Sequence, residues 1–406
     1  MGKILAILHR LGPGLITASL VLGPGSVVSA SRAGAQTGYS LVWVLVVAGF
    51  LMASYTAMGA RLGCALEQTV LGYVARRKGR WLAVLAGLSA FLVTAGFQFG
   101  NNLGVAFASH GLTGTPLWLW PPVFTCVSIV FLFGARRLYP WVERVMMALV
   151  GVMIVAFVAN LFWTKLEMPD LLKGFLPRLP KAGLRIGSAL TATTFSAVAA
   201  FYQAYLVQAK GWTRKELATA IQDAWIGIAV LCTITAVILF GSAESLYGSG
   251  RDFEDAGELA GQLKGLLGPV ANLIFCLGLG AASFSSFVVN ALVGGHLLAD
   301  GLGVDSRIDG RLTKLLAAAV MVVGCTVALA TFQLRQGTTT SLLVAQASTL
   351  VAAPLCAIVL FWLTCSLEPM GELRNRFGSI VLGLAGLVVI LGIDLLGLLH
   401  LCRILG

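Results

Sequence analysis

Long runs of apolar residues, separated by short polar loops, extend from one end of the chain to the other. A helix needs about 20 mostly apolar residues to cross the hydrocarbon layer of a bilayer. The loops are too short to fold a core of their own, so the pattern predicts an all-α integral membrane protein. The eleven expected helices cover 12–36, 39–62, 81–108, 115–134, 139–163, 187–208, 217–241, 269–297, 312–332, 338–364 and 378–401.

Positively charged residues divide the loops into two classes. Most of the 28 lysines and arginines lie near the N-terminus and in the loops around 64–80, 135–144, 209–216, 299–311 and 365–377. Short loops rich in lysine and arginine stay on the cytoplasmic side of a membrane. We therefore expect a multi-pass protein of the cell's inner (plasma) membrane, with the N-terminus in the cytoplasm and the C-terminus outside. This topology explains the net charge of +11, and no nucleic-acid partner is indicated.

A proline-containing loop over 164–186 divides the apolar segments into two groups of five, with one more at the end. Because five is an odd number, the two groups cross the membrane in opposite senses. Many secondary transporters are built from such inverted repeats, with the solute site between discontinuous helices at the repeat interface. We expect a first repeat over 1–163, the outer loop over 164–186, a second repeat over 187–364 and an additional eleventh helix over 365–406.

The first apolar segment is interrupted by Gly23-Pro24-Gly25, followed by Ser26. Glycine and proline break a helix, and the freed backbone groups are tolerated at membrane depth only beside protein or a water-filled cavity. The N-terminal end of a half-helix favours anions, whereas the C-terminal end and loose carbonyl groups favour cations. These four residues are therefore predicted to bind solute. A kink that lets helices pack closely through glycine is the alternative.

Uncharged polar residues in other segments are further candidates for the same site. The sixth segment has neither proline nor glycine over 191–200, so no break is visible there, and its hydroxyl groups fit bonds to their own helix equally well. Amide side chains are costly in hydrocarbon and should face the interior, where they bind solute or join helices. The candidates of these two kinds are Thr194, Ser196, Gln203, Gln98, Asn101 and Gln346.

The eighth segment carries adjacent hydroxyl groups at Ser285 and Ser286. Paired hydroxyls beside a broken helix can complete a sodium site together with backbone carbonyls, so Na⁺ is a candidate coupling ion. Tight helix packing through small residues is the alternative. No other cofactor is indicated.

Ionisable residues are missing from the expected centres of the first, third, sixth and tenth segments. A bare divalent cation there would lose its water without gaining a carboxylate. The middles of the first and sixth segments also lack methionine, which a soft-metal site would use. The eight cysteines are scattered without metal-ligand spacing, and no nucleophile-base-acid arrangement or nucleotide motif indicates an enzyme.

Several motifs resemble those of the NRAMP family of divalent-metal and proton symporters. They include Gly12-Pro13-Gly14, the stretch from Ala33 to Tyr39, Glu143-Arg144-Val145, Leu206-Val207-Gln208 and Gln346, and the resemblance covers nearly the whole chain. It implies a LeuT-like fold, in which a five-plus-five inverted repeat is followed by an eleventh transmembrane helix. It also implies metal ion transport by symport.

The positions that carry the metal ligands of that family are changed in this chain. The family's first-helix motif is Asp-Pro-Gly-Asn, where this chain has Gly23-Pro24-Gly25-Ser26, and its sixth-helix motif is Met-Pro-His, where this chain has Ser196-Ala197-Val198. A second family histidine corresponds to Gln203. The third-helix acid pair of the family's proton route corresponds to Gln98 and Asn101. The resemblance therefore implies a divergent member that lacks the usual metal ligands.

We expect a secondary transporter that works by alternating access and has an uncharged, non-standard site. Such a site favours a small organic solute, for example an amino acid or another carboxylate, over Mn²⁺ or Fe²⁺ carried by proton symport. Two alternatives stay open: a divalent cation, either hydrated like Mg²⁺ or a family-typical metal at a degenerate site, and a non-transporting, receptor-like member. The expected partners are the solute or ion and the lipid bilayer, and the sequence does not set the oligomeric state.

Overall fold

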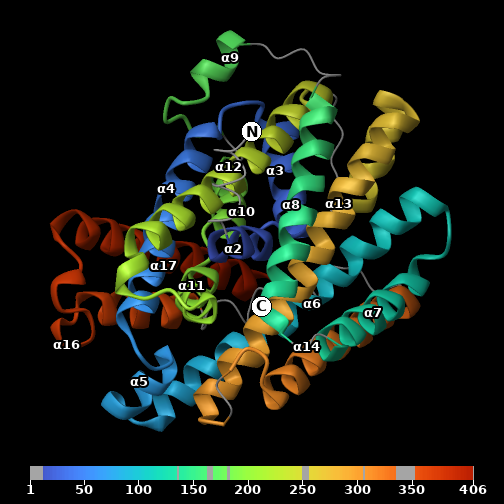
Figure 1. Ribbon diagram of the computed structural model, residues 1–406. Coiled ribbons are helices and arrows are strands. Elements are labelled where there is room, and N and C mark those ends of the chain that lie inside the picture. Colours follow the sequence, from blue (N-terminus) through green and yellow to red (C-terminus); the bar gives the residue numbers. More distant parts are fainter. Residues whose placement is uncertain are drawn as a thin grey trace, which may run out of the picture.

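The computed structural model describes residues 12–134, 137–161, 168–180, 183–248, 256–304, 307–334 and 353–405, and the regular structure of this part is helical (Figure 1). The helices are α2 (Pro13–Val21), α3 (Pro24–Thr37), α4 (Val42–Ala65), α5 (Val70–Lys78), α6 (Arg80–Thr113), α7 (Trp120–Gly134), α8 (Leu138–Leu161), α9 (Met168–Lys173), α10 (Gly183–Thr194), α11 (Ala197–Lys210), α12 (Leu217–Leu246), α13 (Ala256–Leu302), α14 (Arg311–Leu334), α16 (Leu367–Met370) and α17 (Phe377–Leu405). A further helix over Ala353–Cys365 precedes α16.

Within these residues, nine helices are long and apolar enough to cross a membrane, and two bent helix pairs raise the number of spans to eleven. The expected boundaries need correction at three places, one of which is the tenth span, whose bent pair continues to Leu373, past the expected end at 364. The sixth span begins at Gly183, inside the expected outer loop, which also contains α9, and α13 begins at Ala256 instead of 269. Helices continue past the hydrocarbon layer into polar surroundings, where hydropathy gives no signal. Of the expected span 338–364, the part over 338–352 lies outside the described residues.

The first span is two half-helices, α2 and α3, which meet at the predicted break with a bend of 64°. Pro24 has no N–H group to donate, so it begins α3 instead of continuing α2. Gly23 is the extended N-cap of α3, with φ −101° and ψ −178°. The backbone chemistry of these two residues therefore produces a true break and not a kink in a continuous helix.

Both half-helices pack closely against α12 through glycine. A Cβ atom at Gly14 would lie 2.2 Å from the carbonyl oxygen of Asp223, and one at Gly34 would lie 2.2 Å from that of Leu239. On α12, a Cβ atom at Gly227 would lie 2.2 Å from the carbonyl oxygen of Gly14. Small residues allow such close approach of backbones inside a membrane. One continuous helix, α12, thus supports the two halves of the broken one.

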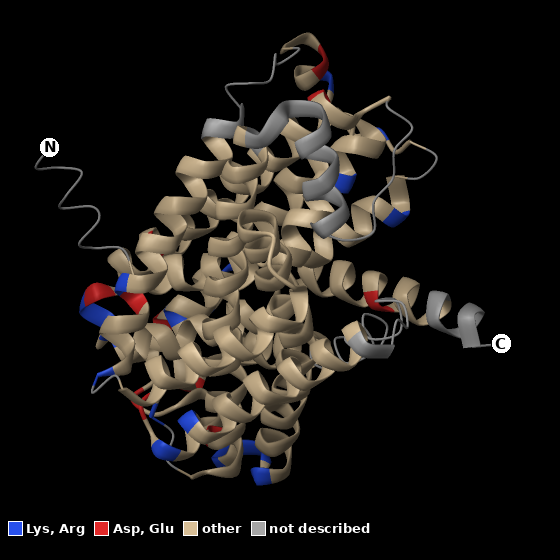
Figure 2. Ribbon diagram, turned by 90° about the vertical axis from the view of Figure 1, so that its right-hand side faces the viewer, with Lys and Arg blue, Asp and Glu red and all other residues tan. Residues whose placement is uncertain are grey.

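Charged residues gather toward the two ends of the bundle, and lysine and arginine are most frequent at the end that holds α5 (Figures 1 and 2). The last turn of α5 alone carries Arg76, Arg77 and Lys78. We call this end of the bundle the α5 end, and the opposite end, beyond which α9 lies, the α9 end. The α5 end is the one that the charge pattern predicts to be cytoplasmic.

Candidate functional site

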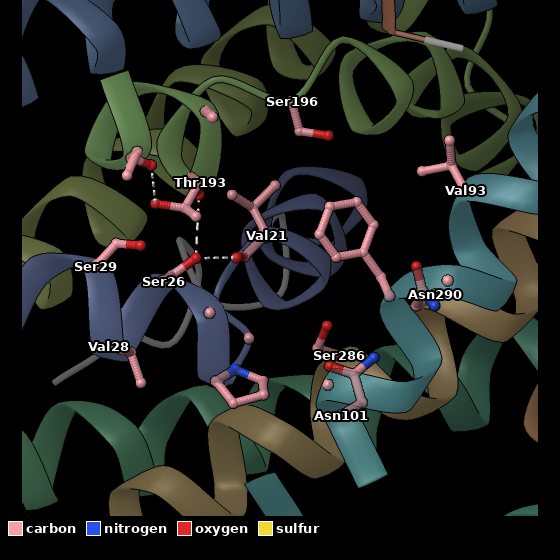
Figure 3. Close-up of a pocket in the computed structure, with 18 of the residues that line it drawn as sticks. Val21, Ser26, Val28, Ser29, Val93, Asn101, Thr193, Ser196, Ser286 and Asn290 are labelled. Carbon is pink, nitrogen blue, oxygen red and sulfur yellow. Dashed lines mark hydrogen bonds between the residues drawn. The ribbon is translucent and has the colours of Figure 1, made fainter. Parts of the chain in front are cut away.

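A cavity of about 790 Å³ lies between the broken first helix, the sixth span, α6 and α13 (Figure 3). Its lining brings together residues far apart in the sequence, among them Val21, Gly23, Pro24, Gly25, Ser26, Asn101, Thr193, Ser196, Ser286 and Asn290. The cavity therefore lies where an inverted-repeat transporter is expected to hold its solute.

The sixth span is also broken, although its sequence shows neither proline nor glycine at the break. α10 ends at Thr194 and α11 begins at Ala197. Ser196 is the N-cap of α11, and its hydroxyl oxygen accepts a hydrogen bond from the backbone N–H of Ala199 at 3.3 Å. Serine is a favoured N-cap residue because it satisfies one of the unpaired donors of the first turn. The expectation of an unbroken sixth helix, one of two that the sequence left open, is wrong.

Ser26 joins the two breaks. Its hydroxyl oxygen lies 2.6 Å from the carbonyl oxygen of Val21, at the end of α2, and 3.0 Å from that of Thr193, near the end of α10 (Figure 3). A hydroxyl group has one hydrogen to donate, so it serves these two carbonyls one at a time. Ser26 therefore links the end of α2 to the end of α10 across the two breaks.

Six of the predicted site residues line the cavity: Gly23, Pro24, Gly25, Ser26, Asn101 and Ser196. A Cβ atom added at Gly25 would meet no atom within 4 Å, so this position faces open space. A Cβ atom at Gly23 would instead lie 3.0 Å from the hydroxyl oxygen of Ser286 and 3.4 Å from the amide oxygen of Asn101. Gly25 is thus the position at which a larger side chain would enter the cavity without disturbing its wall.

Three other predicted residues are buried outside the cavity, and hydrogen bonds between or within helices explain them better than solute contact. Gln98 donates to the carbonyl of Phe287 at 3.1 Å and accepts from Asn290 at 2.9 Å, which joins α6 to α13. Gln203 accepts a hydrogen bond from Thr17. The hydroxyl of Thr194 donates to the carbonyl of Leu190 on its own helix. The remaining predicted residue, Gln346, lies outside the described residues.

The two serines of α13 face the end of α2. The hydroxyl of Ser286 donates to the carbonyl of Leu20 at 3.0 Å, and that of Ser285 lies 3.4 Å from the carbonyl oxygen of Ser19. Only Ser286 also lines the cavity. Two hydroxyls and two helix-end carbonyls therefore gather beside the first break.

The cavity is not free of charge, so the expectation of an uncharged site holds only at the helix breaks. Arg32 on α3, Arg185 on α10 and Asp394 on α17 also line it, and one carboxylate oxygen of Asp394 is buried with no hydrogen-bond partner. The sequence analysis considered the centres of four segments, whereas Arg32 lies far along α3 and Asp394 belongs to the eleventh span. A single aspartate within an apolar run was the available signal.

The two arginines also show where the cavity leads. Arg32 lies in the half of α3 that points away from the break, and Arg185 lies in the first turn of α10. Both helix ends are close to the α9 end of the bundle, where Gly174, the residue after α9, packs against the backbone of Tyr39. The cavity therefore extends from the two breaks toward the α9 end, and positive charge lines its outer part.

On the other side of the cavity, contacts of α2 close the path toward the α5 end. The buried carboxylate of Asp223 on α12 accepts hydrogen bonds from the backbone N–H groups of Gly12 and Gly14, at 2.8 and 2.6 Å. A carboxylate at a helix N-terminus is stabilised by the helix dipole. With the Thr17–Gln203 contact, it holds α2 against α12 and α11.

Metal ligands are sparse in this region. Among the described residues, no three histidine, cysteine, aspartate or glutamate side chains are placed to hold a metal ion together. The cavity offers hydroxyls, amides and backbone groups near the breaks, the carboxylate of Asp394 on α17, and the guanidinium groups of Arg32 and Arg185.

The chain matches a known protein family over nearly its full length. A family model described as natural resistance-associated macrophage protein-like (Nramp) matches residues 14–400. A divalent metal cation transporter MntH of Verminephrobacter eiseniae is 26% identical over 95% of this chain and 88% of the relative. A protein of the same name from Deinococcus radiodurans is 26% identical over 96% of this chain and 89% of the relative.

Solved transporter structures share the fold. A manganese transporter of Eremococcus coleocola, in complex with an aromatic bis-isothiourea compound, superposes with a TM-score of 0.80 at 17% identity, over 96% of this chain and 86% of that one. MhsT in complex with L-phenylalanine superposes with a TM-score of 0.64 at 15% identity, over 96% and 98%. These likenesses and the helices described above confirm the expected all-α, LeuT-like fold.

Proposed function

Because this chain belongs to the natural resistance-associated macrophage protein family, whose members are membrane transporters and not enzymes, it is a secondary transporter, and we propose that it carries a small organic solute with an anionic group. The observation that carries this proposal is the donor set of the cavity. Hydroxyls, amides and two arginines line most of this space, and Asp394 is its one carboxylate among the described residues, whereas a metal site would need several carboxylates or thioethers.

The size of the cavity supports an organic solute. Pockets that enclose small molecules measure about 300–1,000 Å³, and this one measures about 790 Å³. A bare divalent ion is instead held by oxygen ligands about 2.0–2.6 Å away. The open space around Gly25 is more than such an ion fills.

The charges around the cavity support an anionic group on the solute. The first turns of α3 and α11 begin at the two breaks, and the N-terminal end of a helix attracts anions. Arg32 and Arg185 add positive charge along the route from the α9 end, where it would attract an anion and repel a free cation. A carboxylate would thus be favoured both on its way past the two arginines and when bound at the helix N-termini.

Asp394 suggests that the solute also carries a cationic group. Its buried, unpartnered carboxylate oxygen is costly in this setting unless a donor binds it. A zwitterion such as an amino acid would place its carboxylate near the helix N-termini and its ammonium group toward Asp394. This is the solute class that we favour.

We also propose Na⁺ as a coupling ion at Ser285 and Ser286. Sodium would replace the hydrogen bonds that these hydroxyls make to the carbonyls of Ser19 and Leu20, and all four oxygens would then face the ion. An ion there would contact the end of α2, so its binding would depend on the conformation of the first break.

A hydrated divalent cation such as Mg²⁺ is the second candidate. Asp394 and the names of the sequence relatives, which are divalent metal cation transporters, favour it. Mg²⁺ keeps much of its water shell, so hydroxyls and amides would suffice as partners. The two arginines along the cavity argue against it.

A thermal-stability screen of the purified protein separates these candidates. Amino acids, other carboxylates, neutral solutes, Mg²⁺ and Mn²⁺ are each added with and without Na⁺. A ligand that binds only the folded state raises the unfolding temperature. We expect stabilisation by a carboxylate-bearing solute, enhanced by Na⁺ and lost in Arg185→Gln. Stabilisation by Mg²⁺ or Mn²⁺ alone would overturn the organic-solute proposal.

A further inference from the structure

Two tyrosines, a histidine and an aspartate form a buried cluster between α11 and α13, outside the cavity. Tyr202 and Tyr205 come from α11, and His296 and Asp300 come from α13. Between 1% and 3% of the surface of each residue is exposed. Ionisable groups inside a membrane protein are costly, and where they occur they commonly belong to ion or proton pathways. The transport site described above uses none of these four side chains.

The cluster is a connected set of short contacts. The hydroxyl of Tyr202 lies 3.0 Å from Nδ1 of His296, and the hydroxyl of Tyr205 donates to the Asp300 carboxylate at 2.7 Å. The two tyrosine rings are stacked, 5.6 Å apart, and the imidazole ring stands edge-on to that of Tyr205 at 5.1 Å. On the far side, Thr69 donates to the other oxygen of Asp300 at 2.6 Å.

These residues connect the cavity floor to the α5 end. Ala199 and Val293 line the cavity, and Tyr202 and His296 follow them by one helical turn on the same helix faces. Asp300 is one turn farther along α13 than His296. Beyond it comes the half-buried Thr69, next to α5. The cluster therefore spans the layer that separates the closed floor of the cavity from the solution at the α5 end.

The chemistry of the cluster suits reversible protonation. Imidazole gains and loses a proton near neutral pH. A tyrosine hydroxyl both donates and accepts, so Tyr202 can donate to neutral His296 or accept from its protonated form, and the contact persists in both states. Asp300 is one helical turn away from His296, and no described lysine or arginine side chain pairs with its carboxylate. The carboxylate can therefore balance the positive charge of a protonated imidazole.

Two other helices, α14 and α6, pack against α13 beside His296. α14 approaches α13 through Thr313 and Ala317 beside Gly295, and α6 approaches through Thr94 beside Gly294. The exposed Arg80 reaches only the backbone carbonyls of Asp300 and Gly301, at 3.5 and 3.4 Å.

We propose that His296 binds and releases a proton during the transport cycle and exchanges it with the solution at the α5 end through Tyr202, Tyr205 and Asp300. The proton adds to a ring nitrogen of the neutral imidazole and leaves from it again, and no other bond changes. This inference rests on the proposed transport function, to which it adds a second coupling ion. It places the proton site on α13, whereas the amides Gln98 and Asn101 of α6 cannot titrate.

Protonation of His296 can be observed without knowing the solute. The chain has four histidines. ¹³C-labelled histidine in the full-length protein, purified in detergent, gives one ring resonance for each, and His296→Gln identifies the one of interest. We expect this resonance to shift between about pH 5 and 8, and its midpoint to move in Asp300→Asn. A resonance that stays constant over this range would show a permanently neutral residue and overturn the proposal.

Proton movement tests the role in transport. Proteoliposomes loaded with a pH-sensitive dye are given a potassium gradient and valinomycin, so that the membrane potential drives protons inward. We expect His296→Gln and Tyr202→Phe to slow proton entry by about tenfold or more. His110→Gln, which changes a histidine near the α9 end, should leave it unchanged. Equal rates in all four proteins, each above the leak of protein-free liposomes, would show that protons bypass His296 and would overturn the proposal.

The Tyr202→Phe variant keeps the buried ring and removes only the hydroxyl. It therefore distinguishes loss of the proton path from misfolding, which His296→Gln alone would not do. Neither measurement contains a solute. A negative result here therefore removes the proton site and leaves the organic-solute proposal standing, whereas failure of the solute screen would leave the proton site intact.

Discussion

The two broken helices differ in what breaks them. Between α2 and α3, Gly23 and Pro24 prevent a continuous helix by their own backbone chemistry, and the halves bend by 64°. Between α10 and α11, the residues Phe195 and Ser196 have no such restriction, and the whole stretch Gly183–Lys210 passes as one apolar span. The first break is encoded locally. The second combines a local cap, Ser196, with a contact from another helix, that of Ser26 with Thr193.

The largest effect is expected at the locally encoded break, from Gly25→Val. The valine side chain would enter open space and fill part of the cavity. Steric overlap between this side chain and the bound solute should cost about 1–3 kcal/mol, as overpacking does, which corresponds to a loss of about fivefold or more in affinity. Uptake into proteoliposomes of the solute found in the screen should fall by at least this factor, whereas the unfolding temperature should hardly change.

Gly241→Val is the matched control for this variant. It makes the same substitution on α12, also into open space, away from the cavity. It should transport normally. Full transport by Gly25→Val would show that the solute does not pass through the cavity.

The next largest effect is expected from Ser26→Ala, which removes the contact between the two breaks. The carbonyl of Thr193 would lose this donor, whereas that of Val21 would keep the backbone N–H of Gly23 at 2.8 Å. Leaving buried acceptors unsatisfied costs about 1–3 kcal/mol. Denaturant unfolding in detergent should show this loss, and Ser188→Ala, whose hydroxyl bonds only within α10, is the control. Equal stability of both variants would mean that the breaks are independent.

A smaller effect is expected from Ser196→Ala at the context-dependent break. Loss of an N-cap side chain typically costs about 1 kcal/mol. Ser196→Asn keeps a capping oxygen and should restore most of the stability, measured in the same unfolding experiment. If alanine and asparagine behave alike, the cap does not hold the second break.

The smallest effect is expected from Thr194→Val. The hydroxyl of this buried residue bonds only to Leu190 of its own turn, and valine has nearly the same shape. The change in the free energy of unfolding should stay below about 0.5 kcal/mol, and uptake should be unaffected. A strong loss of uptake would show that Thr194 reaches the solute in another state of the cycle.

The sequence predicted what depends on local chemistry. Apolar runs located the spans, and Gly23-Pro24-Gly25 located the first break and one wall of the cavity. It failed where several elements act together. Gln98 and Gln203 are polar residues inside the membrane like Asn101, yet their partners Asn290 and Thr17 on other helices turn them away from the cavity.

The sequence did not predict the charged residues of the cavity, for a related reason. Arg185 and Asp394 belong to helices whose faces toward the cavity are set only by packing. The cluster around His296 likewise joins α11 to α13, whose residues are almost a hundred positions apart in the chain. No spacing rule within one segment would have brought these side chains together.

The central claim is that the cavity between the two breaks does not hold a bare divalent metal. Calorimetric titration of Mn²⁺ into the purified protein at neutral pH tests it directly. We predict no saturable heat up to millimolar Mn²⁺. A saturable micromolar site that disappears in Gly25→Val would contradict the account.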